Sequence, residues 1–198
     1  MLGVCNYRTM EAKARLVLSQ YCFKNLRDAS AIPIEQLIEA LGLEIDYQYL
    51  TKDGQKILGK LICVDGYTPY YDMELHQYML LKVKADTILV EARLAEQENK
   101  GRYRFTLAHE LAHWLIHREL YISQKSEAAF SDGANDTIEK QADYLASALL
   151  MPLASVKHYY YTLMGKGYSK FELINIMANH FGVSKQAMQI RLQAHKLI

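Results

Sequence analysis

The sequence is short of cysteine and contains no long apolar run, and each shortage excludes a class of protein. Its 3 cysteines, Cys5, Cys22 and Cys63, are odd in number, far apart and free of a Cys-x-x-Cys pair, which argues against a disulfide framework and a thiolate zinc site. We expect buried free thiols. No segment approaches the roughly 20 apolar residues of a membrane-spanning helix, and the first residues lack the pattern of a signal peptide. These absences predict a cytoplasmic protein that does not enter a membrane.

The chain also has little net charge, because 23 basic residues face 22 acidic ones and leave a formal charge of +1. Neither an internal repeat nor a low-complexity segment interrupts it. With 198 residues, 51% of them hydrophobic, the chain is long enough for one domain with a core, or for one domain and a small appended module. The composition predicts a globular protein and leaves its function to local motifs.

The most informative segment is His-Glu-Leu-Ala-His at residues 109–113. His109 and His113 are four residues apart, so on a helix they project from one face and both imidazoles can reach one metal ion. Glu110 lies beside them and could activate a water molecule on that ion. The polar arc of a helix over 105–117 lacks the lysines and arginines of a solvated face. This pattern predicts a zinc site with two histidine ligands and Glu110 as general base.

A catalytic zinc ion usually takes three protein ligands and keeps one position open for water. His117 is too far from His109, about 12 Å at roughly 1.5 Å per residue, so we expect it to orient a neighbour or to cap the helix end. Glu139 is the predicted third ligand. It shares a helical face with Asp143, the predicted acceptor for the other ring N–H of a ligand histidine. Alone, this acidic pair would indicate an ordinary first turn favoured by the helix dipole.

Three segments in this order resemble a known family. Residues 104–113 (Arg-Phe-Thr-Leu-Ala-His-Glu-Leu-Ala-His), 139–143 (Glu-x-x-Ala-Asp) and 149–152 (Leu-Leu-Met-Pro) are similar to the ImmA/IrrE family of zinc metallopeptidases. The chain has Ala112 where many relatives have glycine. Both residues are small, so close packing beneath the metal is retained.

The resemblance implies a zinc ion held by His109, His113 and Glu139, with Glu110 as general base. It also implies a protein substrate, because the family typically cleaves helix-turn-helix transcriptional repressors, often in mobile elements or stress responses. A further donor should stabilise the oxyanion that forms during hydrolysis. The sequence offers several candidates for this donor without choosing among them: His158, Tyr159, Tyr160, Tyr161 and Tyr168.

Apolar periodicity and turn residues predict an α+β fold, a minimal zincin-like metallopeptidase in which a small, mostly antiparallel sheet packs on helices. The strand at 57–64 is expected at the sheet edge along the cleft, where an extended substrate could add as a further strand. The tyrosine-rich segment 67–71 is expected to be a loop that either lines a pocket or, as is more common for aromatic loop residues, covers the core. A polar loop from about Arg118 to Asp136 should precede a helix that Thr137 caps. Helices are expected at 7–29, 34–41 and 137–151, and strands at 43–50, 57–64 and 78–92, the last with a break near 85–86.

The last part of the chain carries a separate signal. Residues 153–198 include 6 basic side chains and 1 acidic one. A capping box at 169–172 and the Gly-Val-Ser sequence at 182–184 are typical of a helix-turn-helix. We therefore predict a metallopeptidase core over 1–152 and a helical, helix-turn-helix-like subdomain over 153–198 packed on that core.

The second helix of this pair has two interpretations. On DNA its contacts would be Lys185, Gln186, Gln189 and Arg191. Alternatively the pair packs on the peptidase core or docks the protein substrate. We favour the second interpretation, because 6 basic charges spread over 46 residues form a thin patch. Nucleic acid is the less favoured partner.

The sequence as a whole predicts a zinc-dependent endopeptidase that cleaves a helix-turn-helix repressor and so derepresses its genes. The alternative from another class is a DNA-binding transcriptional regulator with a structural metal. Glu110 argues against it, because a purely structural site has no use for that carboxylate. A third hypothesis is a peptidase that stays latent until a partner or nucleic acid opens its cleft.

Overall fold

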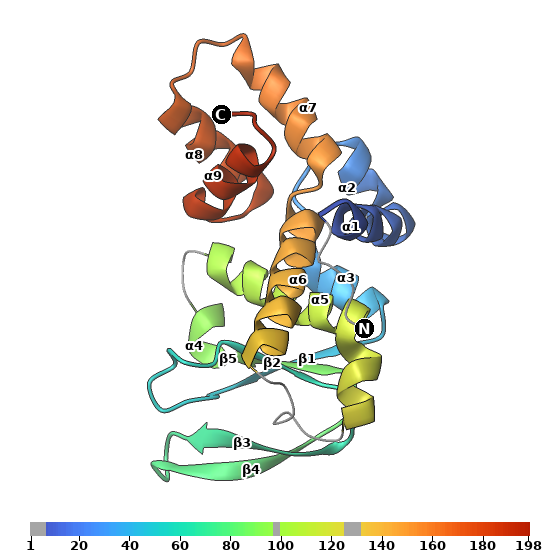
Figure 1. The fold of residues 1–198 in the computed structure, drawn as a ribbon. Coiled ribbons are helices and arrows are strands. Elements are labelled where there is room, and N and C mark those ends of the chain that lie inside the picture. The colour runs from blue at the N-terminus through green and yellow to red at the C-terminus, as the bar shows by residue number, and fades with distance from the viewer. Residues whose placement is uncertain (1–6, 97–99, 125–131) are drawn as a thin grey trace.

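The computed structural model describes residues 7–96, 100–124 and 132–198, which form helices and two small sheets (Figure 1). The helices are α1 (Tyr7–Tyr21), α2 (Phe23–Arg27), α3 (Ile34–Ala40), α4 (Ala92–Ala95), α5 (Lys100–Gln124), α6 (Asp132–Leu150), α7 (Leu153–Met164), α8 (Lys170–Phe181) and α9 (Lys185–Ala194). The strands are β1 (Glu44–Gln48), β2 (Gly59–Ile62), β3 (Gly66–Asp72), β4 (Gln77–Val83) and β5 (Thr87–Glu91).

The larger sheet has the strand order β1-β5-β2. Its central strand, β5, is buried at every residue and pairs parallel with β1 and antiparallel with β2. β3 and β4 form a separate antiparallel hairpin. Two of these three pairings are antiparallel, so the predicted α+β class with a small, mostly antiparallel sheet is confirmed. β2 is an edge strand, as expected for the segment 57–64.

The sheets lie at one end of the molecule and α7, α8 and α9 at the other, with α5 and α6 between them (Figure 1). α5 packs against α6, β2 and β5. One continuous hydrophobic core includes side chains from α1, α3, β5, α5, α6 and all three C-terminal helices. A smaller cluster around Leu50, Val83 and Leu89 joins the hairpin to the larger sheet. Because the core is continuous across residue 152, the division there stays a prediction.

The segment 67–71 is not a loop, which corrects the expectation from its composition. It lies in β3 and pairs with residues 78–82 of β4. Pro69 is tolerated in this strand because a two-stranded hairpin leaves one side of each strand unpaired. The expected break near 85–86 is confirmed, since β4 ends at Val83 and β5 begins at Thr87.

The polar loop expected from Arg118 to Asp136 is mostly helical. α5 continues to Gln124 and α6 begins at Asp132, so Thr137 lies inside α6 and does not cap it. Tertiary contacts extend α5, because Arg118 Nε lies 2.8 Å from Asp86 Oδ1. The remainder of the expected loop, residues 125–131, lies outside the described part of the chain.

The helices near both ends of the chain begin and end mostly where capping and turn residues predict. The helix expected over 7–29 is interrupted at Cys22, between α1 and α2. Ser169 caps α8 through a capping box, Gly182 ends that helix with a left-handed φ of 64°, and Ser184 caps α9. All three features agree with the predicted helix-turn-helix-like geometry.

Cys22 and Cys63 are free and buried, as expected, and Cys5 lies outside the described residues. Over the three described ranges, every helix is too short or too polar to cross a bilayer. The cytoplasmic location stays a prediction.

Candidate metal centre

α5 and α6 bring the predicted ligands together because both helices have small side chains where they meet. Ala108 and Ala112 of α5 and Ala142 and Ala146 of α6 are fully buried. Their short side chains allow the two helix backbones to approach closely. The narrow polar strip of α5 therefore faces the first turns of α6, which carry Glu139.

His109, His113 and Glu139 converge on one point, and their candidate ligand atoms all lie within 4.8 Å of one another. His109 Nε2 is 3.0 Å from His113 Nε2 and 3.1 Å from Glu139 Oε2. His113 Nε2 is 3.5 Å from Glu139 Oε1. Two residues of one helix and one of the next thus present two nitrogens and a carboxylate to a shared space.

This spacing fits a divalent metal ion. A tetrahedral ion with bonds of about 2 Å separates its ligand atoms by roughly 3.3 Å, and the three distances of 3.0, 3.1 and 3.5 Å lie around that value. Two imidazoles and a carboxylate are also the donor set of many catalytic zinc sites with an open position. The group could therefore hold a divalent metal.

Asp143 lies where the sequence places it, one helical turn after Glu139. Its Oδ1 is 2.9 Å from His109 Nδ1. Because a carboxylate only accepts hydrogen bonds, Nδ1 carries the hydrogen and Nε2 of the neutral ring is left free to bind a cation. Asp143 thereby selects the tautomer of His109 that a metal requires.

A second set of contacts selects the tautomer of His113. His117 Nε2 lies 2.9 Å from Gln141 Oε1, which is an acceptor, so this nitrogen carries the hydrogen of neutral His117. His117 Nδ1 then accepts from His113 Nδ1 at 3.1 Å, and the Tyr121 hydroxyl lies 2.8 Å from the same His113 atom. The hydrogen on His113 Nδ1 leaves Nε2 free. His117 thus orients its neighbour, as expected, and is turned away from the candidate ligand group.

Glu110 is buried against β2. A Cβ atom at Gly59 would lie 2.8 Å from Glu110 Oε1 and 2.6 Å from Thr106 Cγ2, so only glycine permits this approach of strand and helix. The backbone of Leu61 donates a hydrogen bond to the Glu110 carboxylate. The predicted general base is therefore held between the motif helix and the edge strand β2.

Ionisation differs sharply among these groups. Burial works to lower the pKa of His109, but hydrogen bonds with Asp143 and Glu139 outweigh it and raise that pKa to about 10. The hydrogen bond from His109 and the nearby His113 ring hold the pKa of Glu139 well below its usual range. Burial raises the pKa of Glu110, because its carboxylate loses contact with water. Without a metal, His109 and Glu139 therefore form an ion pair, and Glu110 is the group whose pKa moves toward neutrality.

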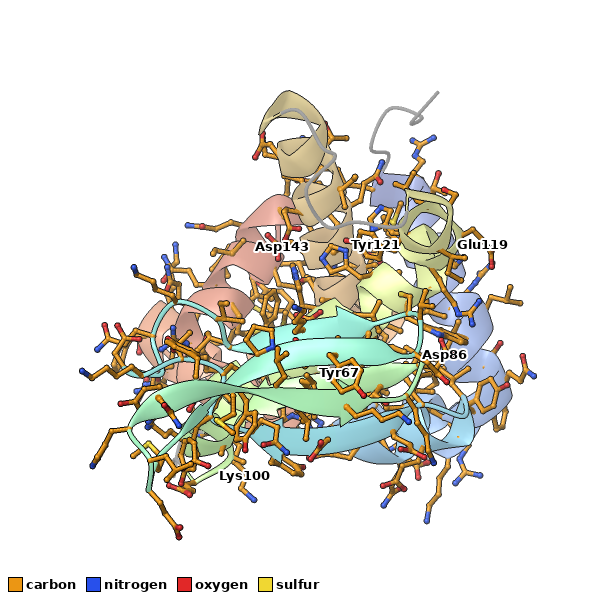
Figure 2. The ribbon with its side chains drawn as sticks, turned by 90° about the horizontal axis from the view of Figure 1, so that it is seen from below. Tyr67, Asp86, Lys100, Glu119, Tyr121 and Asp143 are labelled. Carbon is orange, nitrogen blue, oxygen red and sulfur yellow. The ribbon has the colours of Figure 1, made fainter. Side chains whose placement is uncertain are left out.

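A cleft of about 980 Å³ opens beside the donor group. β2 and its flanking residues form one wall, and His109, Glu110, His113 and Glu139 form the opposite side. Figure 2 looks from the hairpin side and shows Asp143 and Tyr121 on the same side of the strands. Both side chains line the cleft. The edge strand thus borders the donor group, which is the position expected for 57–64.

Comparison with known proteins agrees with this geometry. The family model Peptidase_M78, described as the IrrE N-terminal-like domain, matches residues 76–193, which is more than half of the chain. The chain belongs to this family. The resemblance to ImmA/IrrE proteins is therefore confirmed, and the match includes both helices of the metal centre and extends past residue 152. Family membership and the donor group together support a metallopeptidase.

A solved structure described as a Mycobacterium tuberculosis transcriptional regulator has a similar fold, with a TM-score of 0.53 and 13% sequence identity. The alignment covers 93% of this chain and 46% of that chain, so this protein spans about half the length of the regulator. At this identity the likeness concerns the fold alone. No curated protein matches the sequence.

The structure does not place the predicted oxyanion donors at the cleft beside the metal centre. None of the five residues lines the cleft: His158, Tyr159, Tyr160, Tyr161 and Tyr168. Tyr159 stacks on His180 at 3.8 Å between ring centroids, and the Tyr160 hydroxyl donates to the Leu197 carbonyl. Such a donor must lie about 3 Å from the reacting oxygen, so this placement gives the five candidates no support.

The predicted DNA contacts of α9 divide into two groups. Lys185, Gln186 and Gln189 are exposed. Arg191 is only 5% exposed, pairs with Glu11 at 2.6 Å and donates from Nε and Nη2 to the Met151 carbonyl. Arg191 anchors α9 to the core, so its predicted contact with DNA or a partner is wrong.

Sequence analysis missed Gly59, Tyr121 and Gln141. A glycine inside a strand pattern signals the close approach of another element, and this signal was available for Gly59. Tyr121 and Gln141 carry no local signal. They reach His113 and His117 only because α5 continues beyond the motif and packs against α6.

Proposed function

We propose that the protein is a zinc-dependent endopeptidase. One observation carries this proposal: His109, His113 and Glu139 converge at ligand spacing beside buried Glu110, on the wall of a cleft of about 980 Å³. Imidazole and carboxylate donors with an open position favour zinc among the common divalent ions. A cleft of this size leaves room for a polypeptide beside the donor group.

Glu110 is the proposed general base. When bound, a zinc ion would polarise the scissile carbonyl and lower the pKa of a water molecule to about 7. Glu110 takes a proton from the attacking water as the water oxygen bonds to the carbonyl carbon. It returns that proton to the amine nitrogen as the C–N bond breaks. Burial raises the pKa of Glu110, which strengthens its carboxylate as a base toward the attacking water.

The proposed substrate is a protein, specifically a helix-turn-helix transcriptional repressor whose cleavage derepresses genes of a mobile element or a stress response. Family membership supports a protein substrate. The position of β2 as an edge strand that borders the cleft supports extended binding, since a substrate could pair with it as an added strand while pockets select side chains. The repressor itself rests on the resemblance to ImmA/IrrE proteins.

A DNA-binding regulator with a structural metal has less support. The buried Arg191 removes one of the predicted DNA contacts of α9. A structural metal site is usually closed by four protein ligands, whereas this donor group has three and borders an open cleft.

Co-expression with a repressor encoded beside this gene tests the proposal. The wild-type protein should cleave the repressor, and Glu110→Gln should leave it intact while retaining a full equivalent of metal. Loss of the general base should slow cleavage about 10²- to 10⁴-fold. Cleavage at the wild-type rate by Glu110→Gln would remove Glu110 from its role. An intact repressor with wild type, together with salt-sensitive, sequence-selective DNA binding, would favour the regulator.

A further inference from the structure

A second cavity, of about 570 Å³, lies between α1, α5, α6 and α9, and we call it the α9 groove. Phe105 of α5 and Asp143 of α6 line both this groove and the cleft of the metal centre. The groove therefore begins where the cleft ends. Phe105 precedes His109 by one helical turn, or about 6 Å along the helix axis.

The groove is largely apolar, and its lining also includes the exposed charged residues Arg102 and Asp143. Its walls include Met10, Tyr144, Met151 and Ile190, and Ile190 is 58% exposed. The deeply buried charge in the lining, Arg191, is already neutralised by Glu11 and hydrogen-bonded to the Met151 carbonyl. An occupant of the groove thus meets hydrophobic surface and no buried charge that lacks a partner.

We infer that the α9 groove binds a large apolar side chain of the protein substrate, about two residues from the bond that is cleaved. This inference rests on the proposed function. An extended chain advances about 3.3 Å per residue, so two residues span the roughly 6 Å between the turn of His109 and that of Phe105. The volume of about 570 Å³ has ample room for one large apolar side chain.

Continuity with the cleft identifies the occupant. A substrate held along β2 reaches the groove without leaving the surface that Phe105 and Asp143 share between the two cavities. Burying an apolar side chain there also covers Ile190, and removing apolar surface from water favours binding. The exposed face of α9 that resembles a DNA-recognition helix thereby becomes a wall of the substrate site.

Substrate profiling tests the inference with two matched variants. Ile190→Lys places a positive charge in the groove, and Gln193→Lys places the same charge on an exposed position of α9 that does not line it. Each metal-loaded protein digests a proteome-derived peptide library, and mass spectrometry of the products gives the preference at each position. Wild type and Gln193→Lys should prefer large apolar residues at one position about two residues from the cut. Ile190→Lys should lose that preference or accept acidic residues.

Binding provides a readout that does not depend on turnover. A fluorescent peptide with the preferred wild-type sequence is titrated with metal-loaded Glu110→Gln, alone and combined with each α9 substitution. Ile190→Lys should raise Kd at least tenfold, and Gln193→Lys should leave it unchanged. An unchanged preference and Kd in Ile190→Lys would overturn the groove while leaving the peptidase intact. Absence of any cleavage by wild type would instead remove the proposed function, and the groove's role with it.

The chain's own first residues are the other occupant that the test must distinguish, because Tyr7 lines the groove. A variant that lacks residues 1–6 is titrated with the same peptide. Unchanged Kd supports the substrate as occupant. A Kd at least tenfold lower in the shortened chain would show that the N-terminus fills the groove and would overturn the inference.

Discussion

α5 and α9 have comparable signals in the sequence and opposite arrangements in the structure. Each helix carries polar side chains at a spacing typical of a functional motif. The polar strip of α5 faces Glu139 and an open cleft. One of the two basic side chains of α9 that were predicted to contact DNA, Arg191, is instead buried against Glu11. Helical spacing therefore decides which side chains share a face, and the neighbouring elements decide what that face meets.

The two outcomes have a physical cause. Arg191 lies three residues after Met188 and directly before Leu192, and both of these apolar side chains are fully buried. Packing this apolar stripe carries the arginine into the core, where an ion pair and hydrogen bonds offset its loss of water. On α5, the apolar residues cover the remaining sides of the helix, so the polar strip is the part left to line the cleft.

Glu139→Ala should have the largest effect, and it tests whether the polar strip of α5 faces a metal ligand on α6. Removing the only carboxylate of the donor group should abolish metal binding near neutral pH. The loss should exceed the roughly 10–100-fold that an outer hydrogen-bond partner contributes to metal affinity. Metal content after dialysis and chelator competition measure it. Asp136→Ala, an exposed carboxylate on the same helix, is the control and should keep a full equivalent. A full equivalent in Glu139→Ala would discard this ligand.

The α9 side is tested by Arg191→Met. Removing the guanidinium partner of Glu11 should destabilise the fold by about 3 kcal/mol, near the lower end for buried pairs because the Glu11 side chain is 22% exposed and His195 lies 3.7 Å from it. Urea unfolding measures the change. Gln189→Met, at an exposed position on the same helix, should stay within about 0.5 kcal/mol of wild type. If Arg191→Met kept full stability and lost sequence-selective DNA binding, α9 would be a DNA-recognition helix after all.

The pH dependence of metal binding tests whether His109 of α5 is protonated before the metal binds. The pKa of His109 in the metal-free protein is raised to about 10, so this ring is protonated at neutral pH and a metal must displace the proton. Affinity should therefore rise about tenfold per pH unit between pH 6 and 8. Calorimetry in buffers of different ionisation enthalpy should show about one proton released per metal ion. Affinity that does not change with pH would contradict the ion pair between His109 and Glu139.

The smallest effect is expected at Gln141, which acts on the metal centre through His117. Gln141→Leu removes the acceptor for His117 Nε2–H and should weaken metal binding by about tenfold. This is the low end for residues that hydrogen-bond to a metal ligand, because Gln141 reaches the ligand His113 only through His117. Gln141→Glu retains an acceptor and should restore the affinity. Equal affinity in all three proteins would show that the contact between His117 and His113 does not orient the ligand.

Sequence reasoning was accurate where the signal was local. The capping residues Ser169 and Ser184, the left-handed Gly182 and the break before Thr87 depend on near neighbours in the chain, and each is present in the structure. It failed where a distant contact decides the outcome. Arg118 continues α5 through the expected loop by pairing with Asp86, 32 residues earlier. The tyrosine-rich segment 67–71 is a strand because β4 lies beside it.

The sequence by itself determined the metal centre's components: two histidines and a glutamate on the motif helix, and a carboxylate on the next helix with small residues beside it. These follow from helical periodicity, which is a property of the chain. Only the tertiary structure decided that Tyr121, Gln141 and Gly59 support those residues, that the tyrosines of α7 lie away from the cleft, and that Arg191 is buried. Such outcomes depend on which surfaces exclude water when the elements pack, and spacing along the chain does not specify that.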